Sequence, residues 1–233
     1  MAKIEKTPEN IKAGVAIPTN ESTTLKVISP AIEILIGGPY RGRDGEIHSY
    51  GHAALRVITS VDERVYDFGR YGAITGDFGA EGEGILRVWE RFDTYITGEN
   101  SYGRLTKGYT YLVPVDKANS VNKYFLDIVS KGTTRRAKHP NLKEFKLPQP
   151  YHALTNNCAT VTLSGAKIAL PGIDANGASH IQGRGMSSTE IFAARAKNFG
   201  SWPLQIFMPA DVQSMLEENR KNIPRKITTY GKQ

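Results

Sequence analysis

The residue with the clearest chemical potential is Cys158, the only cysteine of the 233-residue chain. It follows a polar turn, Thr-Asn-Asn at 155–157, and precedes an apolar pattern with helical spacing that ends at Leu170. This position predicts a thiol in the first turn of a helix. There, unpaired N–H groups and the helix dipole favour the thiolate, the form that attacks carbonyl carbons. A lone cysteine is more often a small buried hydrophobe, so a nucleophilic role requires a base nearby.

His52 is the first candidate for that base. It lies in the segment Ser-Tyr-Gly-His-Ala-Ala-Leu-Arg-Val-Ile at 49–58, which has the character of a strand. A nucleophile and its base need to be neighbours only in the fold. An imidazole in contact with the thiol takes its proton and later protonates the leaving group.

A third group should hold the imidazole in its productive tautomer. Asp67, in Val-Tyr-Asp-Phe-Gly at 65–69, lies on a strand predicted to pair with the strand of His52. Its carboxylate can therefore reach the far nitrogen of the ring. His48 or His152 can serve instead, and a solvated aspartate at a strand end is the simpler interpretation of Asp67.

The remaining site assignments concern the oxyanion hole and metals. The backbone N–H of Cys158 is one expected oxyanion donor, and Asn157 and Tyr50 are the candidates for a second. Asn157 is equally an ordinary turn former. No cofactor and no metal are expected. His48 and His52 have the i, i+4 spacing of a zinc pair, but no glutamate accompanies them.

Length and composition favour one soluble domain. The chain has a net charge of +7 and 39% hydrophobic residues, which predicts a globular core and affinity for polyanions. The domain is expected at 27–219, with a polar arm at 1–26 and a basic tail at 220–233. No membrane span and no secretory signal are predicted, so the chain is expected to be made in the cytoplasm.

The order of the expected elements favours an α+β fold, because strands dominate the first half and helices the second. Strands are expected at 31–36, 52–58, 64–68, 85–89, 109–115 and 204–208. Helices are expected at 119–131, 158–170, 187–198 and 209–219. The glycine-rich segment 69–84 and the basic segment 131–146 are expected to be loops.

Three short motifs resemble a known family: Tyr-Gly-His-Ala-Ala-Leu-Arg-Val at 50–57, Val-Tyr-Asp-Phe-Gly at 65–69 and Thr-Asn-Asn-Cys-Ala-Thr-Val at 155–161. Together they are similar to the circularly permuted branch of the NlpC-type papain-like cysteine hydrolases, over roughly residues 30–200. His52 precedes Cys158 by 106 positions, which is the permuted order. The resemblance implies that Cys158 is the nucleophile and His52 the base, in an antiparallel sheet packed against helices.

The same resemblance implies a function. The branch includes relatives of lecithin–retinol acyltransferase and bacterial proteins that cleave cell-wall peptides, some similar to effectors of type VI secretion systems. The expected function is therefore a cysteine amidase or endopeptidase that cleaves peptidoglycan peptides in the periplasm of a target bacterium. A secretion carrier and an immunity protein are the implied partners. The alternatives are a lipid acyltransferase or thioesterase of the same family, and a non-enzymatic nucleic-acid-binding module built on the basic loop and tail.

Overall fold

The computed structural model describes residues 29–42 and 45–231. The expected arm at 1–26 lies outside these residues. The thirteen strands of the described part are β1 (Ala31–Gly37), β2 (Tyr40–Arg41), β3 (Ile47–His48), β4 (His52–Ile58), β5 (Glu63–Gly69), β6 (Ile74–Thr75), β7 (Glu81–Gly82), β8 (Ile85–Trp89), β9 (Thr106–Leu112), β10 (Thr133–Arg135), β11 (Leu142–Lys146), β12 (Tyr151–His152) and β13 (Lys226–Tyr230).

The helices of the same part are α1 (Phe92–Ser101), α2 (Val115–Val129), α3 (Cys158–Ala169), α4 (Gly177–His180), α5 (Ser188–Lys197) and α6 (Pro209–Glu218), with a short 3-10 turn at Asp77–Gly79. The strands form an eight-stranded antiparallel sheet in the order β10-β11-β8-β5-β4-β1-β9-β13. A small sheet, β12-β7-β6, and the ribbon β2-β3 complete the fold.

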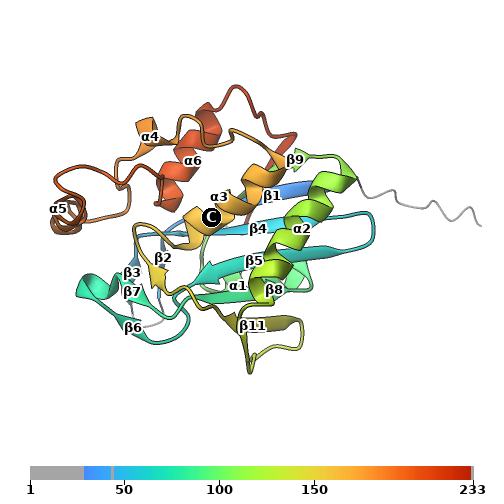
Figure 1. Ribbon diagram of the computed structural model, residues 1–233, viewed down its shortest axis with the longest axis horizontal. Helices are drawn as coiled ribbons and strands as arrows, with labels where there is room; N and C mark the ends of the chain where they lie inside the picture. Colours follow the sequence, from blue (N-terminus) through green and yellow to red (C-terminus); the bar gives the residue numbers. More distant parts are fainter. Residues whose placement is uncertain (1–28, 43–44, 232–233) are drawn as a thin grey trace, which may run out of the picture.

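The helices cover the two faces of the main sheet unequally (Figure 1). On one face α2, α3 and α6 bury the larger core, which includes Leu55, Phe125 and Leu163. On the other face α1 covers a smaller cluster around Leu35, Val65 and Tyr95. Because side chains alternate along a strand, neighbouring residues of β4 and β5 contribute to different faces. The central strands are thus buried on both sides.

The predicted α+β class is confirmed, because a large antiparallel sheet packs against helices. The expected strands at 31–36, 52–58, 64–68 and 85–89 and the expected helix at 158–170 match β1, β4, β5, β8 and α3 to within a residue or so. The predicted hairpin of β4 and β5 is confirmed by its antiparallel register, in which Leu55 lies opposite Tyr66.

Several predictions for the basic segments are corrected. The expected loop at 131–146 contains the hairpin β10–β11, which extends the main sheet at one edge through β8. The segment 220–233 is not only a tail, since Lys226–Tyr230 pairs with β9 at the opposite edge. Charged residues are tolerated on β10, β11 and β13 because many of their side chains are exposed to solvent.

One further prediction fails for a reason of packing, and one helix was not predicted. The expected strand at 204–208 is irregular, although Ile206, Phe207 and Met208 are buried. Their side chains fill the core without a ladder partner, which an apolar run in the sequence cannot reveal. Conversely, α1 was not predicted, because its sequence is polar and contains Gly98.

The glycine-rich segment 69–84 also differs from the expected loop. It contains β6, the 3-10 turn and β7, and β7 pairs with β12 immediately before α3. The segment is therefore tied to the chain that leads into Cys158.

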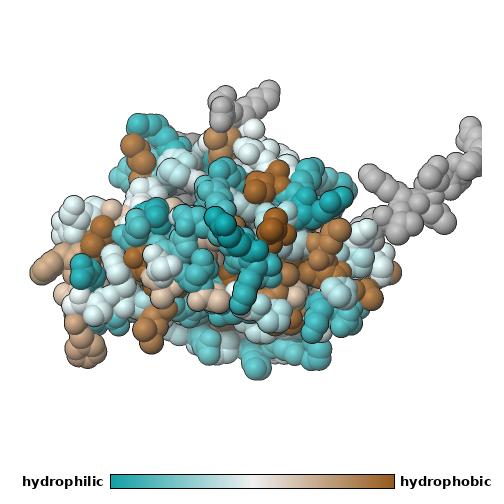
Figure 2. Space-filling model, turned by 90° about the horizontal axis from the view of Figure 1, so that it is seen from above, coloured by the Kyte–Doolittle hydropathy of each residue, from teal (hydrophilic) through white to brown (hydrophobic). Residues whose placement is uncertain are grey.

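The surface seen from above mixes hydrophilic and hydrophobic residues (Figure 2). None of the helices among the described residues is both long and apolar enough to cross a lipid bilayer.

Candidate active site

Cys158 is the first residue of α3, as the sequence predicted. Its helix begins with a capping box: the Asn157 side chain accepts a hydrogen bond from the Thr160 N–H at 3.0 Å, and the Asn157 N–H donates to Thr160 Oγ1 at 2.9 Å. This cap fixes the start of the helix and hence the direction of the thiol. The Cys158 side chain is largely buried but lines a pocket that opens to solvent.

His52 is the first residue of β4 and is buried. It follows Gly51, whose φ of +70° lies in the left-handed region, and a Cβ at Gly51 would meet the Gly37 carbonyl oxygen at 2.6 Å. Glycine is therefore required there for the chain to enter β4 at this angle. His52 interacts both with Asp67 and with Cys158. The fold thus brings together the three residues that the sequence singled out.

Asp67 lies on β5 with its carboxylate buried against the imidazole. His52 Nε2 is 2.6 Å from Asp67 Oδ1. Since a carboxylate accepts hydrogen bonds, Nε2 carries the proton, and Nδ1 is the nitrogen left for the thiol of Cys158. Asp67 is thus in contact with His52, whereas His48 stacks on Tyr40 and His152 bonds within its own turn, at Leu154 and Thr155.

Tyr71 is a further member of this cluster that the sequence did not reveal. Its hydroxyl donates to Asp67 Oδ1 at 2.7 Å and lies 3.2 Å from His52 Nε2. The Arg87 guanidinium lies 3.4 Å from the centre of the Tyr71 ring and is paired with Glu144. Arg87 also lies opposite Asp67 in the β5–β8 register. The sequence gave no indication of the contact between Asp67 and Tyr71, because the two residues are separated by the end of β5.

The electrostatics of the cluster favour a charged pair. Burial lowers the pKa of His52, but the negative charges of Asp67 and Cys158, together with hydrogen bonds to both, outweigh burial and raise this pKa to about 10. Burial raises the pKa of Asp67, yet the charge and hydrogen bond of His52 bring it below its usual value. Burial and then the charge of Asp67 raise the pKa of Tyr71 well above 10, so its hydroxyl keeps its proton.

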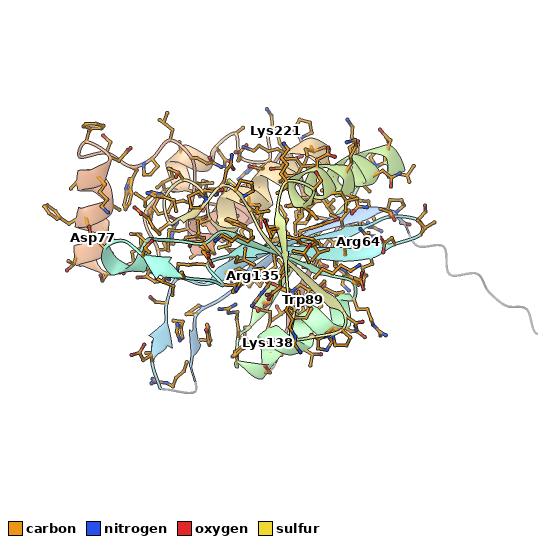
Figure 3. All side chains as sticks on the ribbon, turned by 60° about the horizontal axis from the view of Figure 1, so that its bottom comes forward. Arg64, Asp77, Trp89, Arg135, Lys138 and Lys221 are labelled. Atoms are coloured by element: carbon orange, nitrogen blue, oxygen red, sulfur yellow. The ribbon has the colours of Figure 1, made fainter. Side chains whose placement is uncertain are left out.

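The pocket beside Cys158 has a volume of about 120 Å³. Its walls are mainly apolar, from residues such as Leu154, Met186, Phe207 and Met208, and its charged groups include Arg70 and Lys197. Asp77, which pairs with Lys197 at 3.4 Å, joins the 3-10 turn to α5. Figure 3 shows Asp77 at the left-hand end of the molecule, next to α5.

The two candidates for the second oxyanion donor also line the pocket, but their polar groups are engaged. The Asn157 amide donates to the Ala153 and Phe207 carbonyls while its oxygen caps α3. The Tyr50 hydroxyl donates to Glu190. The Cys158 N–H lies at the first position of α3, where helix N–H groups have no intrahelical acceptor.

Within the described ranges, no three histidine, cysteine, aspartate or glutamate side chains gather closely enough to hold a metal ion. No family model matches the chain, and the searches of curated proteins and of solved structures find no match either. The chemistry of the site therefore rests on its own geometry.

Proposed function

We propose that the protein is a cysteine hydrolase with Cys158 as nucleophile, His52 as general acid and base, and Asp67 as the residue that orients His52. The observation that carries this proposal is the buried contact between His52 Nε2 and Asp67 Oδ1 at 2.6 Å, with Cys158 close enough to act on the pKa of the same imidazole. A structural cysteine in a core needs neither a histidine nor a buried carboxylate behind it.

The reaction follows from these positions. Cys158 Sγ attacks the carbonyl carbon of an amide, and the negative charge that develops on the carbonyl oxygen is stabilised by the Cys158 N–H at the start of α3. The His52 imidazolium gives its proton to the leaving amine, and the C–N bond breaks to leave a thioester on Cys158. His52 then takes a proton from water, which attacks the thioester and releases the acid and the thiolate. Asp67 holds the imidazole in one tautomer throughout.

We propose peptidoglycan peptides as the substrate, with the enzyme acting as an amidase or endopeptidase. The support is the resemblance of the His52 and Cys158 motifs to permuted NlpC-type hydrolases, and the charged groups at the pocket, which suit a polar peptide better than a hydrocarbon. In this proposal the protein is an antibacterial effector, made in the cytoplasm and delivered by a type VI secretion system into the periplasm of a target cell, and an immunity protein protects the producer.

A lipid acyltransferase or thioesterase is the second candidate, because the pocket walls are mainly apolar. Size argues against it. A cavity of roughly 150 Å³ holds one benzene molecule, and this pocket, at about 120 Å³, is smaller still. A short apolar side chain fits such a space, whereas a long acyl chain would extend beyond it through the opening to solvent.

The nucleic-acid alternative depends on cations in the basic segment 131–146 and in the basic tail. Three of these cations face carboxylates: Lys146 and Arg135 pair with Glu83, and Lys143 pairs with Glu90. Cations that are already paired contribute less to a contact with phosphates, so this alternative has less support than the hydrolase.

Incubation of the protein with purified sacculi, followed by mass analysis of the released fragments, tests the proposal. Cys158→Ala and His52→Ala should each lower the rate of release at least about 10³-fold, because each removes a member of one catalytic unit. His48→Ala is the matched control and should retain the rate, since His48 is exposed and stacks on Tyr40. A folded Cys158→Ala protein that releases fragments at the wild-type rate would overturn the assignment.

A further inference from the structure

Arg70 is a cation in the pocket of Cys158 that the proposed reaction does not use. It directly follows β5, the strand of Asp67, and lines the same pocket as Cys158. Among the described residues no carboxylate is paired with its guanidinium, while the neighbouring pocket charges are engaged: Lys197 with Asp77, and Glu190 with Tyr50 and Ser187. Arg70 therefore brings to the pocket a positive charge that has no direct carboxylate partner in the described part of the chain, while Glu190, bonded there only to neutral groups, carries a negative charge at the same pocket.

The side chain of Arg70 is held in place by its surroundings. A Cβ at Gly79 would meet Arg70 Nη1 at 2.8 Å, and a Cβ at Gly82 would meet Arg70 Cγ at 3.0 Å. These two glycines of the 3-10 turn and β7 thus leave the space that the side chain occupies. On another side, the guanidinium lies 5.6 Å from the centre of the Tyr151 ring. An arginine packed on an aromatic ring in this way keeps its fork of donors free for a planar anion.

The charge of Arg70 acts on the groups around Cys158. Burial raises the pKa of Tyr50 to about 12, and Arg70 opposes this rise. Burial and the charge of Cys158 raise the pKa of Tyr151, and Arg70 again opposes the rise. Tyr151 is thus within electrostatic reach of both Cys158 and Arg70. An anionic group on a substrate held at Cys158 would lie within the same reach.

We propose that Arg70 binds a carboxylate of the substrate close to the scissile amide, so that the enzyme selects peptides with a free acidic group at that position. This inference rests on the proposed hydrolase function and names a feature of its substrate class. A guanidinium binds a carboxylate through two parallel hydrogen bonds, which adds orientation as well as attraction. Arg70 is in this proposal a residue that determines specificity, while Cys158 and His52 perform the chemistry.

Alkylation of Cys158 tests the charge of the pocket without any enzyme substrate. Iodoacetate and iodoacetamide attack the same thiol and differ in that iodoacetate carries a carboxylate. We expect Arg70→Gln to lower the ratio of the iodoacetate rate to the iodoacetamide rate about tenfold, because a charged hydrogen-bond partner is lost. Arg70→Lys should restore much of this ratio. Lys138→Gln removes the same charge from a residue that is not among those lining the pocket, and it should leave the ratio unchanged.

Hydrolysis gives the second arm of the test. Stem-peptide fragments are compared with fragments in which each free carboxylate is converted in turn to a carboxamide. For one of these positions wild-type kcat/KM should fall about tenfold or more on amidation, and Arg70→Gln should abolish this discrimination. If Arg70→Gln lowers kcat/KM equally for both members of every pair and leaves the alkylation ratio unchanged, Arg70 is a structural partner of Tyr151 and the inference is wrong. Failure of the hydrolase proposal is a separate outcome, namely a folded Cys158→Ala protein that still cleaves.

Discussion

At the scale of single residues, the candidate site is a small buried network rather than a pair of side chains. Asp67 Oδ1 accepts from both the His52 ring and the Tyr71 hydroxyl, and Tyr71 lies beneath the Arg87 guanidinium. Each group thus restrains the next, and the ring of His52 is fixed from the side away from Cys158. Partly buried charges are expensive to leave unpaired, so loss of one member should disturb the others.

The roles of Asp67 and Tyr71 should separate by magnitude. Asp67→Asn should lower kcat by up to about 10⁴-fold, because an amide at this position favours the wrong tautomer of His52. Tyr71→Phe removes one hydrogen bond to a charged group and should lower kcat about 10- to 100-fold. The measurement is kcat for the release of fragments from sacculi, with unfolding curves to show that each variant is folded.

A second readout distinguishes positioning from simple stability. Asp67→Asn should also slow the alkylation of Cys158 by iodoacetamide at neutral pH, because the charged form of His52 that faces the thiol is lost. His152→Ala is the matched control, since its ring bonds only within its own turn in the described structure. An Asp67→Asn enzyme with wild-type kcat and alkylation rate would show that Asp67 does not orient His52.

At the scale of elements, the position of Cys158 depends on how closely α3 approaches the sheet. Gly165 lies in the middle of α3, and a Cβ there would meet the Phe125 ring of α2 at 2.6 Å and a methyl group of Leu55 at 3.0 Å. The glycine therefore allows α3 to pack against both α2 and β4. Phe125 in turn stacks on Tyr66, with ring centres 4.1 Å apart.

Gly165→Ala should destabilise the protein by about 1–3 kcal/mol, since the added methyl group overpacks a rigid core and outweighs the gain in helix propensity. Gly98→Ala is the matched control within α1. A Cβ at Gly98 would have no other group within 4 Å, so this change should raise stability by roughly 0.5–1 kcal/mol. Chemical unfolding of both variants measures the difference. If Gly165→Ala is as stable as Gly98→Ala, α3 is not held by this contact.

The elements around the site differ in how well the sequence predicts them. Strands β1, β4, β5 and β8 follow from continuous or alternating apolar runs, and α3 follows from the polar turn before an apolar period. The hairpin β10–β11 and the edge strand β13 could not be predicted in this way, because many of their residues are charged. They gain order only by pairing with β8 and β9. Tyr71 and Arg70 were not predicted either, because their contacts are set by the tertiary fold: Tyr71 reaches residues of the main sheet, and Arg70 lies beside Tyr151 of the small sheet.

At the scale of the whole molecule, the sheet joins parts of the chain that are far apart in sequence. Tyr230 of β13 donates to the buried Glu33 of β1 at 2.8 Å, and Arg56 of β4 donates to the same carboxylate at 2.8 Å. His52 and Cys158 are likewise joined only by the complete fold. The pairing of His52 with Asp67 was predictable because the two strands are consecutive and antiparallel, whereas its distance from Cys158 depends on the packing of α3.

The charged pair of His52 and Asp67 should make the stability of the whole protein depend on pH. The pKa of His52 is raised from 6.5 to about 10 in the folded state. The folded protein therefore holds this proton more tightly than the unfolded chain does, so the stabilisation is complete below about pH 6.5 and is lost as pH rises through about 10. At the acid side, the lowered pKa of Asp67 means that its contribution is lost as pH falls through its folded value.

The test compares the free energy of unfolding of the wild type with that of His52→Gln across this range of pH. Between about pH 3.8, the ordinary pKa of an aspartate, and about pH 6.5 the difference should be largest, on the order of 3–5 kcal/mol for a broken buried pair, and it should shrink steadily between about 6.5 and about 10. In an Asp67→Asn background the same His52→Gln change should lose most of this dependence, because the main charge that raises the pKa of His52 is gone. A difference that stays constant from neutral pH to above 10 would mean that His52 is buried in its neutral form, and the imidazolium required by the proposed reaction would then have no support from the fold.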